Sequence, residues 1–331
     1  MQQLSRCTKP LGRTLMRDDM LYANFSATGF ETNIICSGEV SLSLICNTED
    51  SCRITVVIDG DEQNSFKLFV KNGENKLKLA EGLADGSHTI KVVKLTESMI
   101  AQIKFCGLEF DGEVGERPKD KPIKLEVYGD SITCGYWNET TDRDVTGMLR
   151  GDYEDGYNSY AAIAAKLLNA EYQAVSMSGW GLVMGYGPNP DALLPKVWDK
   201  TIPSTDRSVD WDFSNYVADV VVVNLSTNDT SAYTDENGLF TRKFFEDKAV
   251  WMLTQLREKY PDAYIIWANG LMGEGHFAGE IKSAIARCND DKMSYFVMPL
   301  DNFGGEWHPT MKGHIAAGNA LYEEIKRIMK I

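Results

Sequence analysis

The chain has 331 residues, enough for two ordinary domains, and 43% of them are hydrophobic, which is sufficient to fill two cores. Its formal net charge of −14 leaves too little positive charge to neutralise the phosphates of a nucleic acid, and it disfavours a basic helix on a membrane surface. We therefore expect no nucleic-acid partner and no membrane partner, and a neutral or small molecule instead.

The sequence gives no sign of export or membrane insertion. No run approaches the roughly 18 apolar residues needed to span a bilayer, and the beginning, MQQLSRCTKPLGRT, lacks the apolar core of a signal peptide. The seven cysteines are odd in number and form no CxxC pair. A reduced, cytoplasmic protein is the simplest interpretation. The alternative is a secreted protein whose signal peptide is missing from this sequence.

Residues 12–111 have the pattern of an all-β domain. Short segments that alternate or cluster apolar residues are separated by the turn signals SGE, DGDEQN, KNGEN and ADGS. These segments are TNIICS, VSLSLIC, RITVVID, SFKLFV, NKLKLA, HTIKVVKLT and AQIKFCGLEF. Strands at this spacing predict an antiparallel sandwich or jelly roll, which we assign to residues 1–117.

A charged segment with two prolines, residues 112–122, predicts a linker, and beyond it strands and helices alternate. Four consecutive valines at 220–223 indicate a strand buried on both faces. The alternation predicts an α/β domain, residues 118–331, with a parallel sheet covered on both sides. The expected strands are 123–130, 171–179, 219–229, 263–270 and 292–300, and the expected helices are 157–170, 242–260, 279–289 and 308–331.

Ser131 lies where the first strand of this second domain ends. Gly129 and Asp130, which precede it, favour a turn. Side chains at the carboxyl ends of strands in an open α/β sheet can face a ligand crevice. A serine placed there is a candidate nucleophile, provided that the chain also supplies a base and an oxyanion pocket.

Only four histidines can supply the base. His88 falls in a strand of the β domain and is expected at the surface. His276 follows a strand and could approach a site, whereas His314 should point away from His308 on the last helix. His308 lies at the junction WHPT before that helix, with Pro309 suited to its first turn. These positions leave His308 and His276 as candidates.

Four short motifs resemble the blocks of the SGNH hydrolases, in the same order. They are GDSIT at 129–133, SGWG at 178–181, STND at 226–229 and WHP at 307–309. LGRT, GSHTIKVVKLTE, GDSITCGY and SGWGLV resemble carbohydrate esterase family 2, which contains acetylxylan and acetylmannan esterases. The resemblance implies a flavodoxin-like SGNH domain preceded by a jelly roll. It also implies deacetylation of plant polysaccharides or oligosaccharides, such as xylan, mannan or glucomannan, without a cofactor.

The resemblance assigns a role to each motif residue. Ser131 is the nucleophile and also donates its backbone N–H to the oxyanion. Gly179, with Gly181 as the neighbour most easily confused with it, contributes a second backbone N–H. Asn228 contributes a side-chain amide, and His308 is the general base. Chemistry agrees, because a hydroxyl becomes a good nucleophile only when a base takes its proton, and the resulting oxyanion needs hydrogen-bond donors.

One position departs from the superfamily pattern. The triad aspartate normally lies three residues before the histidine, and here that position is Gly305. Glu306 and Asp301 are nearby carboxylates without the usual spacing. Members of the family that lack the aspartate hold the histidine through a backbone carbonyl. We therefore predict a Ser–His dyad, with Glu306 as the alternative orienter of His308.

Other residues near the motifs have either a binding or a structural interpretation. Trp307 is a candidate platform for a sugar ring or a core tryptophan, and Trp180 and Trp137 are weaker candidates for the same role. Asp130 and Asp229 are expected to brace loops by hydrogen bonding. The sequence contains no HExxH or paired Cys/His spacing, so we predict no metal site.

The resulting prediction is a serine esterase that removes O-acetyl groups through an acetyl-enzyme intermediate and loses activity as acid protonates His308. Two alternatives remain: a GDSL-type esterase or lipase for longer acyl chains, and a non-catalytic carbohydrate-binding protein. The sequence leaves open which glycan and which hydroxyl are involved. It also leaves open the oligomeric state, a homo-oligomer included.

Overall fold

The computed structural model describes residue 4 and residues 8–233 and 238–331; Cys7 lies outside this part. The chain forms two compact units. The first consists of Met1–Asp120, Gly147–Tyr157 and Lys200–Asp210, and the second of Lys121–Thr146, Asn158–Asp199 and Trp211–Ile331. Two short segments within the predicted second domain, residues 118–331, therefore belong to the first unit.

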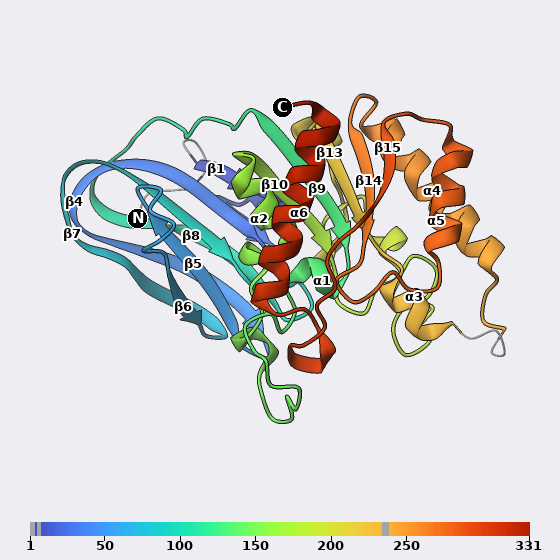
Figure 1. Ribbon diagram of the computed structural model, residues 1–331. Coiled ribbons are helices and arrows are strands. Elements are labelled where there is room, and N and C mark those ends of the chain that lie inside the picture. Colours follow the sequence, from blue (N-terminus) through green and yellow to red (C-terminus); the bar gives the residue numbers. More distant parts are fainter. Residues whose placement is uncertain (1–3, 5–7, 234–237) are drawn as a thin grey trace. The chain divides into compact units, whose positions relative to one another are not determined.

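The first unit is all-β, as predicted (Figure 1). Its main sheet is antiparallel with the strand order β2-β3-β8-β4-β7-β5-β6, and β1 pairs with β4. Alternate side chains of the long strands meet in an apolar core that includes Phe30, Ile54 and Phe105. The strands are β1 (Thr8–Leu11), β2 (Thr14–Arg17), β3 (Met20–Ala23), β4 (Thr28–Thr48), β5 (Cys52–Ile58), β6 (Phe66–Val70), β7 (Gly73–Lys94) and β8 (Ala101–Val114), with a separate pair β11 (Lys200–Ile202) and β12 (Asp206–Asp210).

Two of the predicted turns in this unit are wrong. SGE at 37–39 lies within β4, and ADGS at 84–87 lies within β7. The two stretches face each other, with Cys36 opposite Gly86 and Gly38 opposite Leu83, and the register shifts between these pairs. They form a bulge rather than two turns. Short polar segments that contain glycine are typical of both features, so local composition could not separate them.

The second unit contains a five-stranded parallel sheet in the order β10-β9-β13-β14-β15. Each expected strand is present: β9 (Ile123–Gly129), β10 (Ala170–Ser176), β13 (Val220–Asn224), β14 (Tyr264–Asn269) and β15 (Met293–Val297). The four valines of β13 are fully buried. A strand can bury every side chain only when both faces of its sheet are covered, which confirms the predicted α/β layering.

Helices cover both faces of this sheet (Figure 1). On one face, α2 (Tyr160–Leu167) and α6 (Met311–Met329) share a core with Leu125 and Val222 of the strands. On the other, Tyr260 at the end of α4 (Arg242–Lys259) donates to the Glu126 carboxylate of β9. Helix α5 (Ala278–Cys288) packs against α4. In α4, Phe245, Met252 and Leu256 are buried, whereas Phe244 is 46% exposed.

The strand order determines where a ligand crevice forms. From β9 the chain crosses to β10 on one side and later returns to β13 on the other side of β9. Ligands of open α/β sheets bind at such switch points, beyond the carboxyl ends of the strands. Two short helices that the sequence did not predict begin there, α1 (Ser131–Cys134) after β9 and α3 (Thr227–Ala232) after β13. Across the described residues, every helix is too short or too polar to cross a membrane.

Candidate active site

Ser131 is the first residue of α1, just beyond the end of β9, the strand that lies between β10 and β13. Asp130 caps this helix, because its side-chain oxygen accepts a hydrogen bond from the backbone N–H of Ile132 at 3.1 Å. The turn between strand and helix therefore holds Ser131 at the carboxyl edge of the sheet.

His308 contacts Ser131, although it lies near the other end of the second domain in the sequence. Its Nε2 lies 2.9 Å from the Ser131 Oγ, although the two residues are 177 positions apart. His308 precedes α6, whose N-cap is Thr310, with the hydroxyl accepting from the Gly313 N–H at 3.1 Å. Pro309 thus lies one residue before the cap and not in the first helical turn, contrary to the prediction. The structure brings the predicted nucleophile and base within hydrogen-bond distance.

The other ring nitrogen of His308 faces a backbone carbonyl. Nδ1 lies 3.1 Å from the carbonyl oxygen of Glu306. A carbonyl can only accept, so Nδ1 carries the proton and Nε2 is left to accept from the serine hydroxyl. The carboxylate of Glu306 instead accepts from the Tyr136 hydroxyl at 3.2 Å. Glu306 therefore orients His308 with its backbone carbonyl, and its carboxylate, the alternative to the predicted dyad, does not contact the imidazole nitrogens.

Asp301, the other nearby carboxylate, has a structural position. It accepts hydrogen bonds from the backbone N–H and the hydroxyl of Thr310, both at 3.0 Å. It therefore braces the start of α6 and, through it, the segment that carries His308.

The loop that presents the Glu306 carbonyl is strained. Glu306 and Trp307 have φ values of 46° and 63°, in the left-handed region that side chains with a Cβ rarely adopt. Each such residue costs roughly 1–2 kcal/mol. Strain of this kind persists where surrounding contacts enforce it, and it is typical of functional sites.

Tyr136 is a site residue that the sequence analysis missed. Its ring packs edge-on against the His308 imidazole, with centroids 4.7 Å apart. It stands within the motif GDSITCGY, but nothing in the sequence around it distinguishes it from a core tyrosine.

Burial lowers the pKa of His308 to about 4, while the backbone carbonyls of Glu306 and Gly305 act in the opposite direction. The imidazole is therefore neutral at pH 7, as a general base requires.

Asn228, the expected side-chain donor, lies in the first turn of α3 and is buried. Its Nδ2 donates to the carbonyl oxygen of Trp180 at 2.9 Å and lies 3.2 Å from a carboxylate oxygen of Asp130. Both amide hydrogens thus have acceptors in the resting site.

The two glycines of the SGWG motif have different environments. The Gly181 N–H donates to the Ala192 carbonyl at 3.0 Å, and a Cβ at Gly181 would lie 1.9 Å from the Met184 carbonyl oxygen. Gly181 is therefore needed for packing. Gly179 has a φ of 76°, and a Cβ there would meet the Tyr186 Cβ at 3.7 Å, an ordinary van der Waals contact. This difference favours Gly179 over Gly181 as the backbone donor.

Asp229 links the loop of these glycines to α3. Its buried carboxylate accepts three successive backbone N–H groups, those of Leu182 at 3.0 Å, Val183 at 2.7 Å and Met184 at 2.9 Å. Burial nevertheless raises the pKa of Asp229 to about 6, against the lowering effect of these hydrogen bonds. The residue next to Asn228 thus fixes the segment that follows Gly179.

The three tryptophans proposed as sugar platforms differ in exposure. Trp307 is 56% exposed, and the Arg143 guanidinium lies 3.8 Å from its ring centroid. Trp137 is buried, and Trp180 is only 6% exposed. The interpretation of Trp180 and Trp137 as platforms is therefore not supported. Trp180 contributes its carbonyl to Asn228, and Arg143 is a second residue that the sequence analysis missed.

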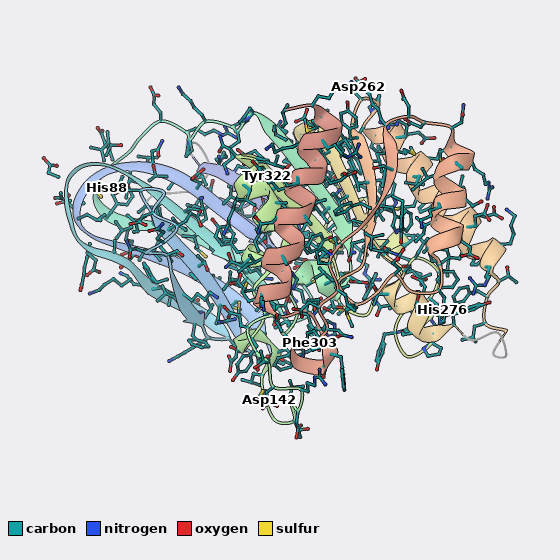
Figure 2. The ribbon with its side chains drawn as sticks, viewed as in Figure 1. His88, Asp142, Asp262, His276, Phe303 and Tyr322 are labelled. Carbon is teal, nitrogen blue, oxygen red and sulfur yellow. The ribbon has the colours of Figure 1, made fainter. Side chains whose placement is uncertain are left out.

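The remaining histidines lie elsewhere. His88 contacts the Asp59 carboxylate at 2.8 Å in the first unit, and His314 is buried, with Nδ1 accepting from the Tyr160 N–H at 3.0 Å. His276 is exposed beside Tyr233 at the end of α3, and it is well separated from Phe303 of the His308 segment in Figure 2. Of the two candidates for the base, His308 is the one that lies within hydrogen-bond distance of the Ser131 hydroxyl.

Comparisons with known proteins match most of the chain. A cellulase/esterase of Acetivibrio thermocellus is 33% identical over 282 residues; the match covers 82% of this chain, which spans about a third of that relative's length. An acetylxylan esterase/glucomannan deacetylase of Cellvibrio japonicus is 26% identical, with 96% of this chain and 88% of the relative covered. A family two carbohydrate esterase from Clostridium thermocellum, solved with cellohexaose, has a TM-score of 0.87 and 30% identity, covering 98% of this chain and 99% of the other.

The parallel sheet and the Ser–His pair at its switch point define a carboxylic ester hydrolase with the SGNH fold. The model of the GDSL-like lipase/acylhydrolase family matches residues 127–327, and that of the carbohydrate esterase 2 N-terminal domain matches residues 11–118. The chain belongs to carbohydrate esterase family 2, which confirms the family that the sequence motifs implied.

The lowered pKa of His308 predicts activity in mild acid. Because the folded-state pKa lies below its usual value, the neutral base persists as the pH falls from 7 to 5 and is lost through about pH 4. We expect kcat/KM for p-nitrophenyl acetate to be half-maximal near pH 4. The pH profile of the initial rate measures this, and a midpoint at the usual histidine value of about 6.5 would contradict it.

Glu306→Gln should leave most of the activity intact, because the substitution keeps the backbone carbonyl that faces His308. We expect kcat to change by no more than about twofold, the effect of an ordinary surface substitution. Glu323→Gln on α6, another exposed carboxylate, is the matched control. A loss near 10³-fold would instead mean that the carboxylate acts as the third member of a triad.

Asp229→Asn should separate activity from stability. An amide cannot accept all three backbone N–H groups, so the Gly179 segment shifts, and we expect kcat for p-nitrophenyl acetate to fall on the order of 10²-fold. Because its pKa is raised, the buried carboxylate costs stability as the pH rises through about 6. At pH 7 the removal of this charge offsets part of the cost of the lost hydrogen bonds, so the urea midpoint of the variant should fall only slightly.

Asp212→Asn serves as the control for this variant, because Asp212 is exposed and its carboxylate accepts from the Ser214 N–H at 3.0 Å, away from the catalytic pair. Unchanged kcat in Asp229→Asn, or a loss of activity that follows a loss of stability, would count against the positioning role of Asp229.

Proposed function

We propose that this chain is a serine esterase that removes O-acetyl groups from plant polysaccharides or oligosaccharides, such as xylan or glucomannan. The observation that carries the proposal is the 2.9 Å contact between the Ser131 hydroxyl and the His308 imidazole, with Nδ1 held by a carbonyl. The names of the relatives, an acetylxylan esterase/glucomannan deacetylase among them, support the substrate class.

The first half of the reaction acylates the serine. His308 Nε2 takes the hydroxyl proton while Ser131 Oγ forms a bond to the acetyl carbonyl carbon. This general-base step typically contributes 10²–10⁴-fold. The carbonyl oxygen becomes an oxyanion, which the backbone N–H groups of Ser131 and Gly179 and the amide of Asn228 stabilise. Each such donor contributes roughly 2.7–4 kcal/mol. The carbon–oxygen bond to the sugar then breaks, and the imidazolium returns its proton to the sugar oxygen.

The second half releases acetate. Water takes the place of the sugar alcohol, and His308 removes its proton as the water oxygen bonds to the acetyl carbon. The second oxyanion uses the same donors. When it collapses, the bond to Ser131 Oγ breaks, and the proton on Nε2 returns to the serine. The Glu306 carbonyl holds the Nδ1 proton throughout, so the ring keeps the required tautomer.

Trp307 is our candidate for contact with the sugar that carries the acetyl group. It directly precedes His308, and its ring is more than half exposed. Arg143 covers one face of the ring, which leaves the other for a pyranose. An aromatic ring held in this way presents a rigid apolar surface at little entropic cost.

The proposal predicts that wild-type protein, but not Ser131→Ala, releases acetate from acetylated xylo- and manno-oligosaccharides. Loss of the nucleophile should reduce the rate by about 10³-fold or more. Loss of acetyl signals in NMR spectra follows the reaction and also identifies the hydroxyl positions that are cleared. Equal acetate release by both proteins would exclude the proposed nucleophile.

A second comparison addresses the alternative of a lipase-like esterase. Acetyl and octanoyl esters of p-nitrophenol are offered to the wild-type protein under the same conditions. A deacetylase should prefer the acetyl ester, whereas a higher kcat/KM for the octanoyl ester would favour the alternative. If neither ester nor any acetylated oligosaccharide is cleaved, the remaining alternative, a carbohydrate-binding protein, is favoured.

A further inference from the structure

A groove of about 630 Å³ lies beside the start of α6, in the second unit. Its volume falls within the roughly 300–1,000 Å³ typical of ligand sites. Residues from three segments line it: 138–141, 299–303 and 310–316. The proposed mechanism uses none of these lining residues.

The groove adjoins the loop that carries His308. The Gly304 N–H donates to the His308 carbonyl at 2.8 Å, so the two ends of this loop meet. Phe303, which precedes the loop, and Thr310, which follows it, both line the groove. The Gly305 N–H lies 3.3 Å from the carbonyl of Thr140, another lining residue. The loop that positions His308 is thus bounded by residues that line the groove.

A row of exposed side chains connects the two. Trp307 is 56% and Phe303 is 58% exposed. The Arg143 guanidinium lies 3.8 Å from the Trp307 ring centroid and 5.9 Å from that of Phe303. In Figure 2, Phe303 and Asp142, the neighbour of Arg143, lie at the same edge of the second unit. Contiguous exposed aromatic groups of this kind are typical of binding surfaces.

The polar side chains of the groove suit an uncharged, hydroxyl-rich ligand. Two carboxylates, Glu139 and Asp301, and the ammonium of Lys312 line it, and Thr141 adds a hydroxyl. The Asp301 carboxylate already accepts two hydrogen bonds from Thr310. A strongly charged ligand would gain little from this mixture, because attraction to one group is offset by repulsion from the other. Sugar hydroxyls, in contrast, both donate and accept hydrogen bonds, and the apolar face of a sugar ring can cover Phe303.

We propose that this row and groove form a subsite for sugar residues of the substrate chain beyond the one that carries the acetyl group. The inference rests on the proposed function. The polysaccharide lies across Trp307 and Phe303 and enters the groove while its ester reaches Ser131. The occupant is a segment of the same substrate chain, because Phe303 and Thr310, at the two ends of the His308 loop, line the groove.

Phe303→Ala tests the subsite. For an acetylated hexasaccharide we expect KM to rise roughly 3- to 10-fold, the effect of losing one aromatic contact, with kcat unchanged. For p-nitrophenyl acetate and an acetylated disaccharide, which do not reach the groove, both constants should stay at wild-type values. Phe244→Ala on α4, whose side chain is 46% exposed, is the matched control and should change nothing.

A second readout does not depend on hydrolysis. In the Ser131→Ala background, Phe303→Ala and, separately, Lys312→Ala should weaken the binding of unacetylated xylohexaose or mannohexaose, measured by calorimetry. Lys312 is exposed, so its removal should leave the fold intact.

Three outcomes overturn the subsite: no change at any chain length, equal losses for the hexasaccharide and p-nitrophenyl acetate, or unchanged hexasaccharide binding in the second readout. Failure of the proposed function has a different signature. The wild-type protein would then cleave no acetylated oligosaccharide, whatever the state of Phe303.

Discussion

The site depends on the two hydrogen bonds of one imidazole. His308 must place Nε2 on Ser131 while Nδ1 is held by the Glu306 carbonyl, and the structure satisfies both, at 2.9 Å and 3.1 Å. The first bond joins the end of β9 to the segment before the last helix. The second requires Glu306 and Trp307 to adopt left-handed backbone conformations. The position of the base is therefore obtained at the expense of local backbone strain.

Replacing a carboxylate by a carbonyl changes the electrostatics of the base. A carboxylate on Nδ1 would stabilise the imidazolium through its full charge, whereas a carbonyl offers only a dipole. Burial then dominates, and the pKa of His308 falls to about 4. A base of this kind is intrinsically weaker, but it stays unprotonated in mild acid. The lower pKa thus weakens the driving force for proton transfer to His308, but it widens the pH range in which His308 is unprotonated.

The sequence predicted the second unit well because its signals are local. Buried β-branched runs such as Val220–Val223 and the alternation of strands with helices specify a parallel sheet with few alternatives. The first unit was predicted only as a class. SGE and ADGS, interpreted as turns, form a bulge between β4 and β7, and a bulge depends on which strand lies opposite. That information is not contained in either segment.

The catalytic site shows the same division between local and long-range information. Four site residues belong to short motifs that can be recognised by their order along the chain: Ser131, Gly179, Asn228 and His308. The group that orients His308 could not be identified in this way, because every residue has a carbonyl and only the path of the backbone selects one. Arg143 was missed for a related reason: its loop has no motif, and its position over Trp307 arises only when two distant segments meet. Sequence motifs therefore reveal the atoms that react, whereas the contacts that orient them and extend the binding surface come from the fold.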